Sequence, residues 1–149
     1  MSSNIVDGDL TVPPPKPFGE MCFLELPVTD AGRAAKFYTA VLGWKCGEAS
    51  MPSPTPWVKS VHFFNKGGLN GAFLLMEKSN QIINYDGSKP ERVSVLPTFC
   101  VASIEETVEK AEKLGGKVHV PKTAIGGGMG FFCRFIDCEG NLVGIWAQE

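Results

Sequence analysis

The sequence CFLELPVTDAGRAAKFYTAVLGW, residues 22–44, predicts a strand followed directly by a capped helix, and the fold class follows from this pattern. Apolar and polar residues alternate from Cys22 to Val28, as they do in a half-buried strand. Asp30 stands at the N-cap position, where its carboxylate can accept from free backbone N–H groups, and Gly43 ends the helix. An apolar stripe at helical spacing predicts packing against a sheet; it consists of Ala34, Phe37, Tyr38, Val41 and Leu42.

Outward from this stretch, the sequence predicts a strand-helix-strand-strand-strand unit that occurs twice. In the first unit a proline-rich loop follows Lys45, and two strands are expected at about 57–64 and 70–76, with a turn at Gly67-Gly68. The second unit starts with a strand at 96–101 and a helix capped by Ser103. That helix ends at Gly115-Gly116, and three strands are expected after it, at about 117–120, 130–136 and 142–148.

A constant spacing supports an internal duplication. Five landmarks of the second unit each follow their counterparts by 73 residues: Val101 and Val28, Ser103 and Asp30, Gly116 and Gly43, Gly144 and Gly71, Trp146 and Phe73. Two unrelated α/β segments would not keep this register through their last strands, so the spacing predicts a repeat.

The overall composition is that of one globular domain. The chain has 149 residues, 44% of them hydrophobic and 20% charged, with a net charge of −2, so we expect neither a nucleic-acid nor a membrane partner. Five cysteines without a CxxC pair, and no apolar run near the ~20 residues of a membrane span, predict a cytoplasmic protein. We expect a flexible arm over residues 1–18 and a single domain over 19–149, in which module one (about 20–78) and module two (about 93–149) are joined by a linker (79–92).

Two motifs resemble a known family. FYTAVLGW (37–44) and DCEGNLVGIW (137–146) are together similar to the glyoxalase/bleomycin-resistance/extradiol-dioxygenase group, the vicinal oxygen chelate superfamily. The resemblance covers about residues 20–149. It implies an α+β fold of two tandem βαβββ modules, whose eight strands form a cupped, partly closed sheet with the active site inside the cup.

The resemblance also implies where a divalent metal would bind. Relatives take His or Glu ligands from the first and last strand of each module. These positions fall at Phe23, near Gly71, at Leu96 and at Gly144, and none of these side chains can ligate a metal. We therefore expect no metal cofactor. The two histidines, His62 and His119, lie on other predicted strands and are interpreted as hydrogen-bonded or surface residues.

The alternation of side chains along the predicted strands indicates which residues line the cup. Large aromatic side chains beside glycines would form a flat-walled slot for a planar or apolar molecule, although a closed, filled core is an equal alternative. The expected ligand-binding residues are Phe23, Phe73, Leu96, Thr98, Met129, Gly144 and Trp146. Met129 belongs to a glycine-rich stretch, 126–130, interpreted either as a flexible loop over the cup mouth or as a plain hairpin connection.

Glu25 is the candidate catalytic residue. It shares a predicted strand face with Phe23, and burial among Phe23, Phe73 and Trp146 would raise its pKa and suit it to proton abstraction. The structural alternative, in which the carboxylate ties down backbone N–H groups or the module junction, is favoured.

The sequence thus predicts a small-molecule-binding protein that works without a metal. Two alternative functions are compatible with the sequence. One is an enzyme (a lyase, isomerase or dioxygenase relative) that uses Glu25 as base or a non-standard metal site such as Glu25 with His62; the other is an interaction domain with a filled cup. Relatives often pair, and some of them exchange modules, so we expect a homodimer.

Overall fold

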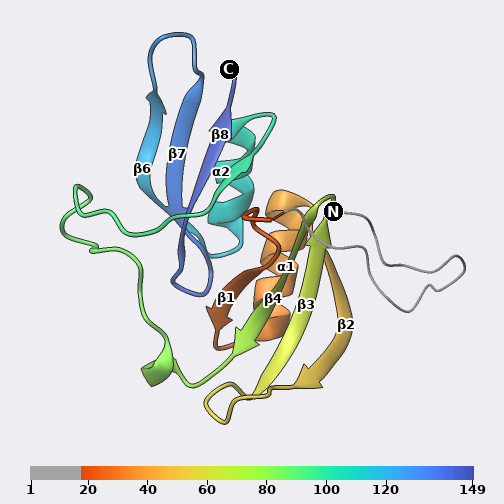
Figure 1. Cartoon of the computed structure of the whole chain (residues 1–149). Helices are drawn as coiled ribbons and strands as arrows, with labels where there is room; N and C mark the ends of the chain where they lie inside the picture. Colours follow the sequence, from red (N-terminus) through yellow and green to blue (C-terminus); the bar gives the residue numbers. More distant parts are fainter. Residues whose placement is uncertain (1–17) are drawn as a thin grey trace, which may run out of the picture.

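A computed structural model describes residues 18–149 and contains two modules of the same topology (Figure 1). The expected arm, 1–18, lies outside the described residues except for Phe18. Module one comprises β1 (Leu24–Val28), α1 (Ala31–Leu42), β2 (Lys45–Pro52), β3 (Ser60–Lys66) and β4 (Leu69–Leu75), followed by a short 3₁₀ helix, η1 (Lys78–Asn80). Module two comprises β5 (Thr98–Cys100), α2 (Ile104–Lys113), β6 (Lys117–Ala124), β7 (Phe131–Ile136) and β8 (Leu142–Ala147).

The strand order confirms the predicted α+β fold of two βαβββ modules. The orders are β1-β4-β3-β2 and β5-β8-β7-β6, with one parallel and two antiparallel pairings in each module. The eight strands are divided between two four-stranded sheets that do not close into a barrel.

One strand was missing from the sequence prediction. Residues 45–52 form β2, which pairs with β3, whereas the sequence predicted a loop there. Seven of its eight residues are exposed, and a register shift lies between Cys46 and Ser50. An edge strand of this kind lacks the apolar alternation from which strands are recognised.

Both helices begin at the predicted caps. Asp30 accepts from the Arg33 backbone N–H at 2.9 Å, and Ser103 Oγ accepts from the Glu106 N–H at 3.2 Å. Gly43 ends α1 in the left-handed conformation, with φ of 69°. Each helix therefore starts where a short polar side chain satisfies its first turn, as the sequence predicted.

The constant spacing of 73 residues is wrong beyond the helices. Asp30 and Ser103 are 73 residues apart, but the left-handed glycine that matches Gly43 is Gly115, 72 residues later. In the sheets Glu25 pairs with Ala72, and the equivalent pair is Thr98 with Gly144, so β8 follows β4 by 72 residues. A one-residue offset places a side chain on the opposite face of its sheet. Three of the five matched pairs therefore do not correspond in space: Gly116 and Gly43, Gly144 and Gly71, Trp146 and Phe73.

A single hydrophobic core lies on the helix side of both sheets. Tyr38, Trp44 and Phe64 stack with centroid distances of 4.3 and 4.2 Å within module one. Contacts of Phe37 with Phe135 and of Trp44 with Phe99, at 6.1 and 5.3 Å, extend the core into module two. Burial of this aromatic surface stabilises the association of the two modules.

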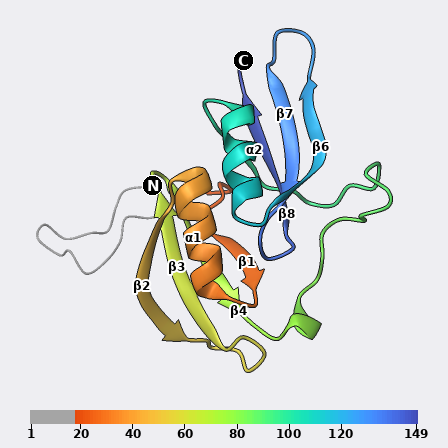
Figure 2. The same cartoon turned by 180° about the vertical axis from the view of Figure 1, so that it is seen from behind.

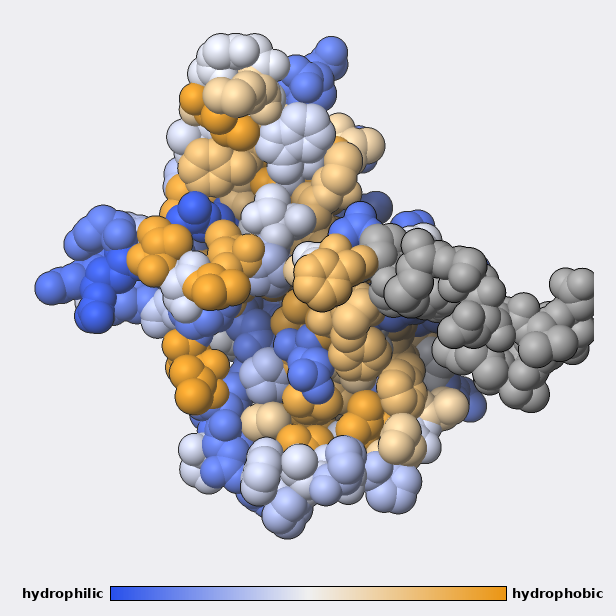
Figure 3. Space-filling view, in the orientation of Figure 1, coloured by the Kyte–Doolittle hydropathy of each residue, from blue (hydrophilic) through white to orange (hydrophobic). Residues whose placement is uncertain are grey.

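The other face of each sheet is open. Figure 2 shows both helices on the same side of the molecule, and Figure 1 looks onto the two sheet faces that no helix covers, with the linker passing over one end of the module two face. Apolar side chains gather over the open face of module one (Figure 3). They include exposed Phe23, Met51 and Phe63 and a small separate cluster of Val58, Val61, Ala72 and Met76.

Candidate functional site

The open face of module one carries the predicted base. Glu25, Ala72 and Phe63 form one row across β1, β4 and β3, because directly paired residues project from the same face. Phe23 lies two residues before Glu25, and its ring meets that of Phe63 edge-to-face at 6.4 Å. Both rings are 41% exposed, and Glu25 is also exposed. Within the described residues of a single chain, Glu25 is therefore not buried as the sequence predicts.

Phe73 is the predicted lining residue that the structure places elsewhere. It pairs with Leu26 of β1 and faces α1, with 1% exposure and its ring 5.8 Å from that of Tyr38. Gly71 faces the same way, and a methyl group there would meet the Leu24 carbonyl at 2.3 Å. The expectation that Phe73 lines the cup beside Glu25 is wrong, because β8 follows β4 by 72 residues, so Phe73 is not the counterpart of Trp146.

In module two the predicted lining residues do share the open face. Thr98, Gly144 and Arg134 form the row equivalent to Glu25, Ala72 and Phe63. A methyl group at Gly144 would lie 2.6 Å from Thr98 Oγ1 and 3.4 Å from a Leu96 methyl carbon. Glycine at this position thus lets the side chains of β5 lie over β8.

Aromatic side chains occupy the next row of this face. Trp146 pairs with Phe132 and is half-buried, and the Arg134 guanidinium lies 5.3 Å from the Phe132 ring centroid. The open faces therefore differ in charge, with a carboxylate in the central row of module one and a guanidinium in that of module two.

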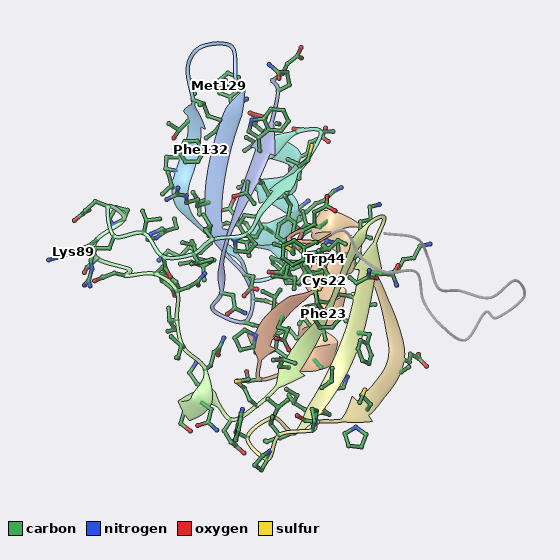
Figure 4. All side chains as sticks on the ribbon, in the orientation of Figure 1. Cys22, Phe23, Trp44, Lys89, Met129 and Phe132 are labelled. Atoms are coloured by element: carbon green, nitrogen blue, oxygen red, sulfur yellow. The ribbon has the colours of Figure 1, made fainter. Side chains whose placement is uncertain are left out.

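Met129 lies in a hairpin connection, the second of the two alternatives. The Trp146 indole N–H donates to the Met129 carbonyl at 2.8 Å, and the Gln148 amide donates to the Gly128 carbonyl at 3.2 Å. Gly126, Gly127, Gly128 and Gly130 all have positive φ, which permits this tight turn between β6 and β7. Figure 4 shows Met129 and Phe132 on module two, well away from Phe23 on module one.

The metal positions implied by the family do not fit a metal. The positions that the family pattern implies are occupied on the open faces by Phe23, Ala72, Leu96 and Gly144, and none of these four side chains carries a donor atom. Within residues 18–149 no group of three or more His, Cys, Asp and Glu side chains could hold a metal ion.

The alternative metal pair, Glu25 with His62, is divided by the sheet. His62 pairs with Phe73 and Glu25 with Ala72, so the two side chains lie on opposite faces. His62 Nε2 lies 2.8 Å from Ser60 Oγ, and the His119 ring lies 5.5 Å from that of Tyr85. Both histidines have the hydrogen-bonded or packed surroundings expected of structural residues.

The cysteines that are removed from solvent are not reactive nucleophiles. All five are free of disulfides. Burial raises the pKa of Cys133 to about 11 and that of Cys138 to about 12, so both thiols are protonated at neutral pH.

The structure shows two buried carboxylates that sequence reasoning does not identify. Asp137 and Glu139 lie in the turn between β7 and β8 and are 3% and 5% exposed. Tyr38 donates to Asp137 at 2.5 Å, and the backbone N–H groups of Thr29 and Asp30 each donate to Glu139 at 2.8 Å. The motif 137–146 contains both acids, but their partners lie about a hundred residues away in the sequence.

Clefts lie along the linker and between α1 and β2, and the second is also lined by Phe63 of the module one open face. One of about 470 Å³ follows the linker around Tyr85 and Arg92. Another of about 360 Å³ lies between α1 and β2, beside Cys46 and His62. Neither takes in Glu25, Thr98 or Trp146, so these residues do not form an enclosed pocket in the described part of a single chain.

The chain belongs to the Glyoxalase/Bleomycin resistance protein/Dioxygenase superfamily, whose family model matches residues 21–145. A search of curated proteins found no match. None of the described helices is long and apolar enough to cross a membrane.

Solved structures of low sequence identity share the fold. The fosfomycin resistance protein FosX from Listeria monocytogenes has a TM-score of 0.61 at 20% identity, with 86% of this chain and 92% of FosX covered. The antibiotic binding protein TnmS3 from Streptomyces sp. CB03234 has a TM-score of 0.57 at 18% identity, with 86% and 94% covered. A glyoxalase I mutant from Zea mays has a TM-score of 0.63 at 16% identity, with 87% and 45% covered.

Proposed function

We propose that this protein binds a small, planar or apolar molecule at its open sheet faces, without a catalytic metal. The observation that carries the proposal is the pair of uncovered faces, which present half-exposed aromatic side chains around Ala72 and Gly144 where relatives carry metal ligands. Aromatic walls beside small residues suit a flat ligand. The description of TnmS3 as an antibiotic binding protein agrees with a binding role for this fold.

We propose further that the cup is completed in a homodimer. Each open face is only one wall, and the central rows carry opposite charges, Glu25 in module one and Arg134 in module two. When module one of one copy faces module two of another, these charges are complementary. We expect the dimer to act in the cytoplasm, where five free cysteines stay reduced.

Binding is tested with the aromatic fluorophore 1-anilinonaphthalene-8-sulfonate. We expect saturable binding to the wild type, and at least about tenfold weaker binding to Phe23→Ala, which removes an open-face ring worth about 1.4 kcal/mol or more. Phe18→Ala is the matched control, because Phe18 is fully exposed and lies before β1. Equal affinities of the wild type and both variants would contradict the proposal.

Pairing of the faces is tested by charge reversal. Sedimentation equilibrium should show a dimer for the wild type and weaker association for Glu25→Arg and for Arg134→Glu. The double variant should recover association, because the charges are then exchanged. A monomeric wild type, or reversals without effect, would reject this arrangement.

Metal content separates the binding protein from a metalloenzyme. We expect the purified protein to contain less than about 0.1 equivalent of Zn, Ni, Mn or Fe by elemental analysis, since a structural or catalytic site needs about three or four ligands. A stoichiometric metal that EDTA removes with loss of binding would overturn the metal-free proposal.

A metal-free enzyme is the second candidate, and one observation favours it. Glu25 is the carboxylate in the central row of module one, beside Phe23, where a facing module would cover it. On any substrate found, Glu25→Gln should then abolish turnover and leave binding intact. Unchanged turnover of Glu25→Gln would exclude Glu25 as the base.

A further inference from the structure

The turn between β7 and β8, residues 137–141, joins the two modules through buried polar contacts. Figures 1 and 2 both show it beside β1 and the start of α1. The Glu139 side chain is fully buried there and accepts from two backbone N–H groups of module one, those of Thr29 and Asp30. Arg33 of α1 pairs with the same carboxylate, its Nε donating at 2.6 Å. One acidic side chain of module two thus satisfies the corner between β1 and α1.

Asp137 makes a second connection, to the middle of α1. One carboxylate oxygen accepts from the Tyr38 hydroxyl at 2.5 Å, and the other accepts from the backbone N–H groups of Glu139 and Asn141 at 2.7 and 2.9 Å. Tyr38 is fully buried, and burial, with the charge of Asp137, raises its pKa well above the ordinary value. The carboxylate therefore fixes the shape of its own turn and binds a helix of the other module.

Side-chain amides complete the junction. Asn141 donates to the Pro27 carbonyl at 2.9 Å, and Gln81 donates to the Glu139 carbonyl at 2.7 Å. Asn84 both donates to the Leu142 carbonyl and accepts from its N–H, at 3.0 and 2.9 Å. Module one, the linker and module two thus meet at the same turn.

These contacts differ in kind from the apolar core that also joins the modules. Apolar contacts are non-directional and tolerate repacking, whereas hydrogen bonds of buried groups are satisfied in one geometry. Rotating one module would leave the Glu139 carboxylate, one oxygen of Asp137 and the Tyr38 hydroxyl without the partners that they have across the junction, and within residues 18–149 no buried side-chain polar atom lacks a partner.

We propose that the 137–141 turn fixes the relative orientation of the two modules, with Asp137 and Glu139 as positioning residues. In this orientation both helices lie on one side and both sheet faces open on the other, so a chain cannot bring its own two faces together. A ligand cup would then need the sheet face of a second copy. This consequence for the cup is the only part of the inference that rests on the proposed function.

Residual dipolar couplings measure module orientation directly and are the test. In the wild type, couplings from both modules should fit one alignment tensor. In Asp137→Asn/Glu139→Gln, each module should still fit its own structure, but the two tensors should differ in magnitude and direction. Glu105→Gln/Glu109→Gln, which removes two exposed charges from α2, is the matched control and should keep one tensor.

Loss of stability alone would not produce this pattern, because a less stable chain with fixed modules keeps a common tensor. A shared tensor in the double variant, or two tensors in the wild type, would overturn the proposal. If the double variant does not fold, Tyr38→Phe and Glu139→Gln provide the same comparison singly. The couplings do not depend on any ligand. The proposal on module orientation can therefore be contradicted while the proposal on ligand binding holds, and the reverse.

Discussion

The two equivalent hairpins of the modules have different surroundings. In module one the β3–β4 turn is Gly67-Gly68, and a methyl group added to either glycine would meet nothing within 4 Å. In module two the β7–β8 turn carries Asp137 and Glu139, both buried against module one. The repeat thus duplicates a fold without duplicating its contacts. Only one copy of the hairpin joins the modules, and this asymmetry defines how they sit.

The largest expected difference between the hairpins comes from Asp137→Ala. The change leaves the buried Tyr38 hydroxyl and the N–H groups of Glu139 and Asn141 without their acceptor, and we expect it to cost about 3 kcal/mol. Lys66→Ala, at the matching position of the module one hairpin, should cost less than about 0.5 kcal/mol. Urea denaturation measures both, and equal losses would contradict the asymmetry.

A second difference concerns the two glycines that the 73-residue spacing had matched. Gly71→Ala should cost about 2 to 3 kcal/mol, because its methyl group meets the Leu24 carbonyl, which is backbone and cannot move aside. Gly144→Ala should cost about 1 kcal/mol, because the Thr98 side chain can change rotamer. Thermal unfolding of both variants decides, and the reverse order would show that the assigned register is wrong.

Alkaline pH should weaken the hairpin junction through Tyr38. Its pKa is raised in the folded state, so its contribution to stability is complete below pH ~10 and is lost as the pH rises through the folded pKa. Over that interval the free energy of unfolding should fall by about 1.4 kcal/mol per pH unit more in the wild type than in Tyr38→Phe. Parallel pH profiles of the two proteins, from urea titrations, would refute the role of this pair.

The smallest effect on stability is expected on the open faces. Phe23→Ala should change the free energy of unfolding by less than about 1 kcal/mol, because its ring is only partly buried in the isolated chain. Phe135→Ala, in the core of module two, should cost about 3 to 5 kcal/mol. A large loss for Phe23→Ala at concentrations where the protein is monomeric would show that this face is part of the core.

Features set by neighbouring residues could be predicted from the sequence. The caps at Asp30 and Ser103 and the paired modules depend on short-range patterns, and the structure confirms them. The strand β2 escaped prediction because its residues are mostly exposed and lack alternation. Phe73 was assigned to the wrong face because module two is one residue shorter between the helix start and the last strand.

The buried carboxylates at the module junction could not be predicted from the sequence, because their contacts are long-range. A buried carboxylate was expected at Glu25, at the cup or the module junction, whereas the junction uses Asp137 and Glu139. Their partners lie 99 and 109 positions away, and no local spacing reports such contacts. The motif 137–146 indicated the family, but its role at the module junction emerged only from the fold.

Native mass spectrometry of the freshly purified protein tests metal-free binding in a dimer, because one spectrum reports assembly, bound small molecule and bound metal. We predict a dimer of the 16.1 kDa chain that carries adducts of small-molecule mass and no metal. Loss of the adducts in Phe23→Ala, but not in Phe18→Ala, would place them at the open faces. A bare monomer, or a chain with one metal ion per subunit, would contradict the proposed function.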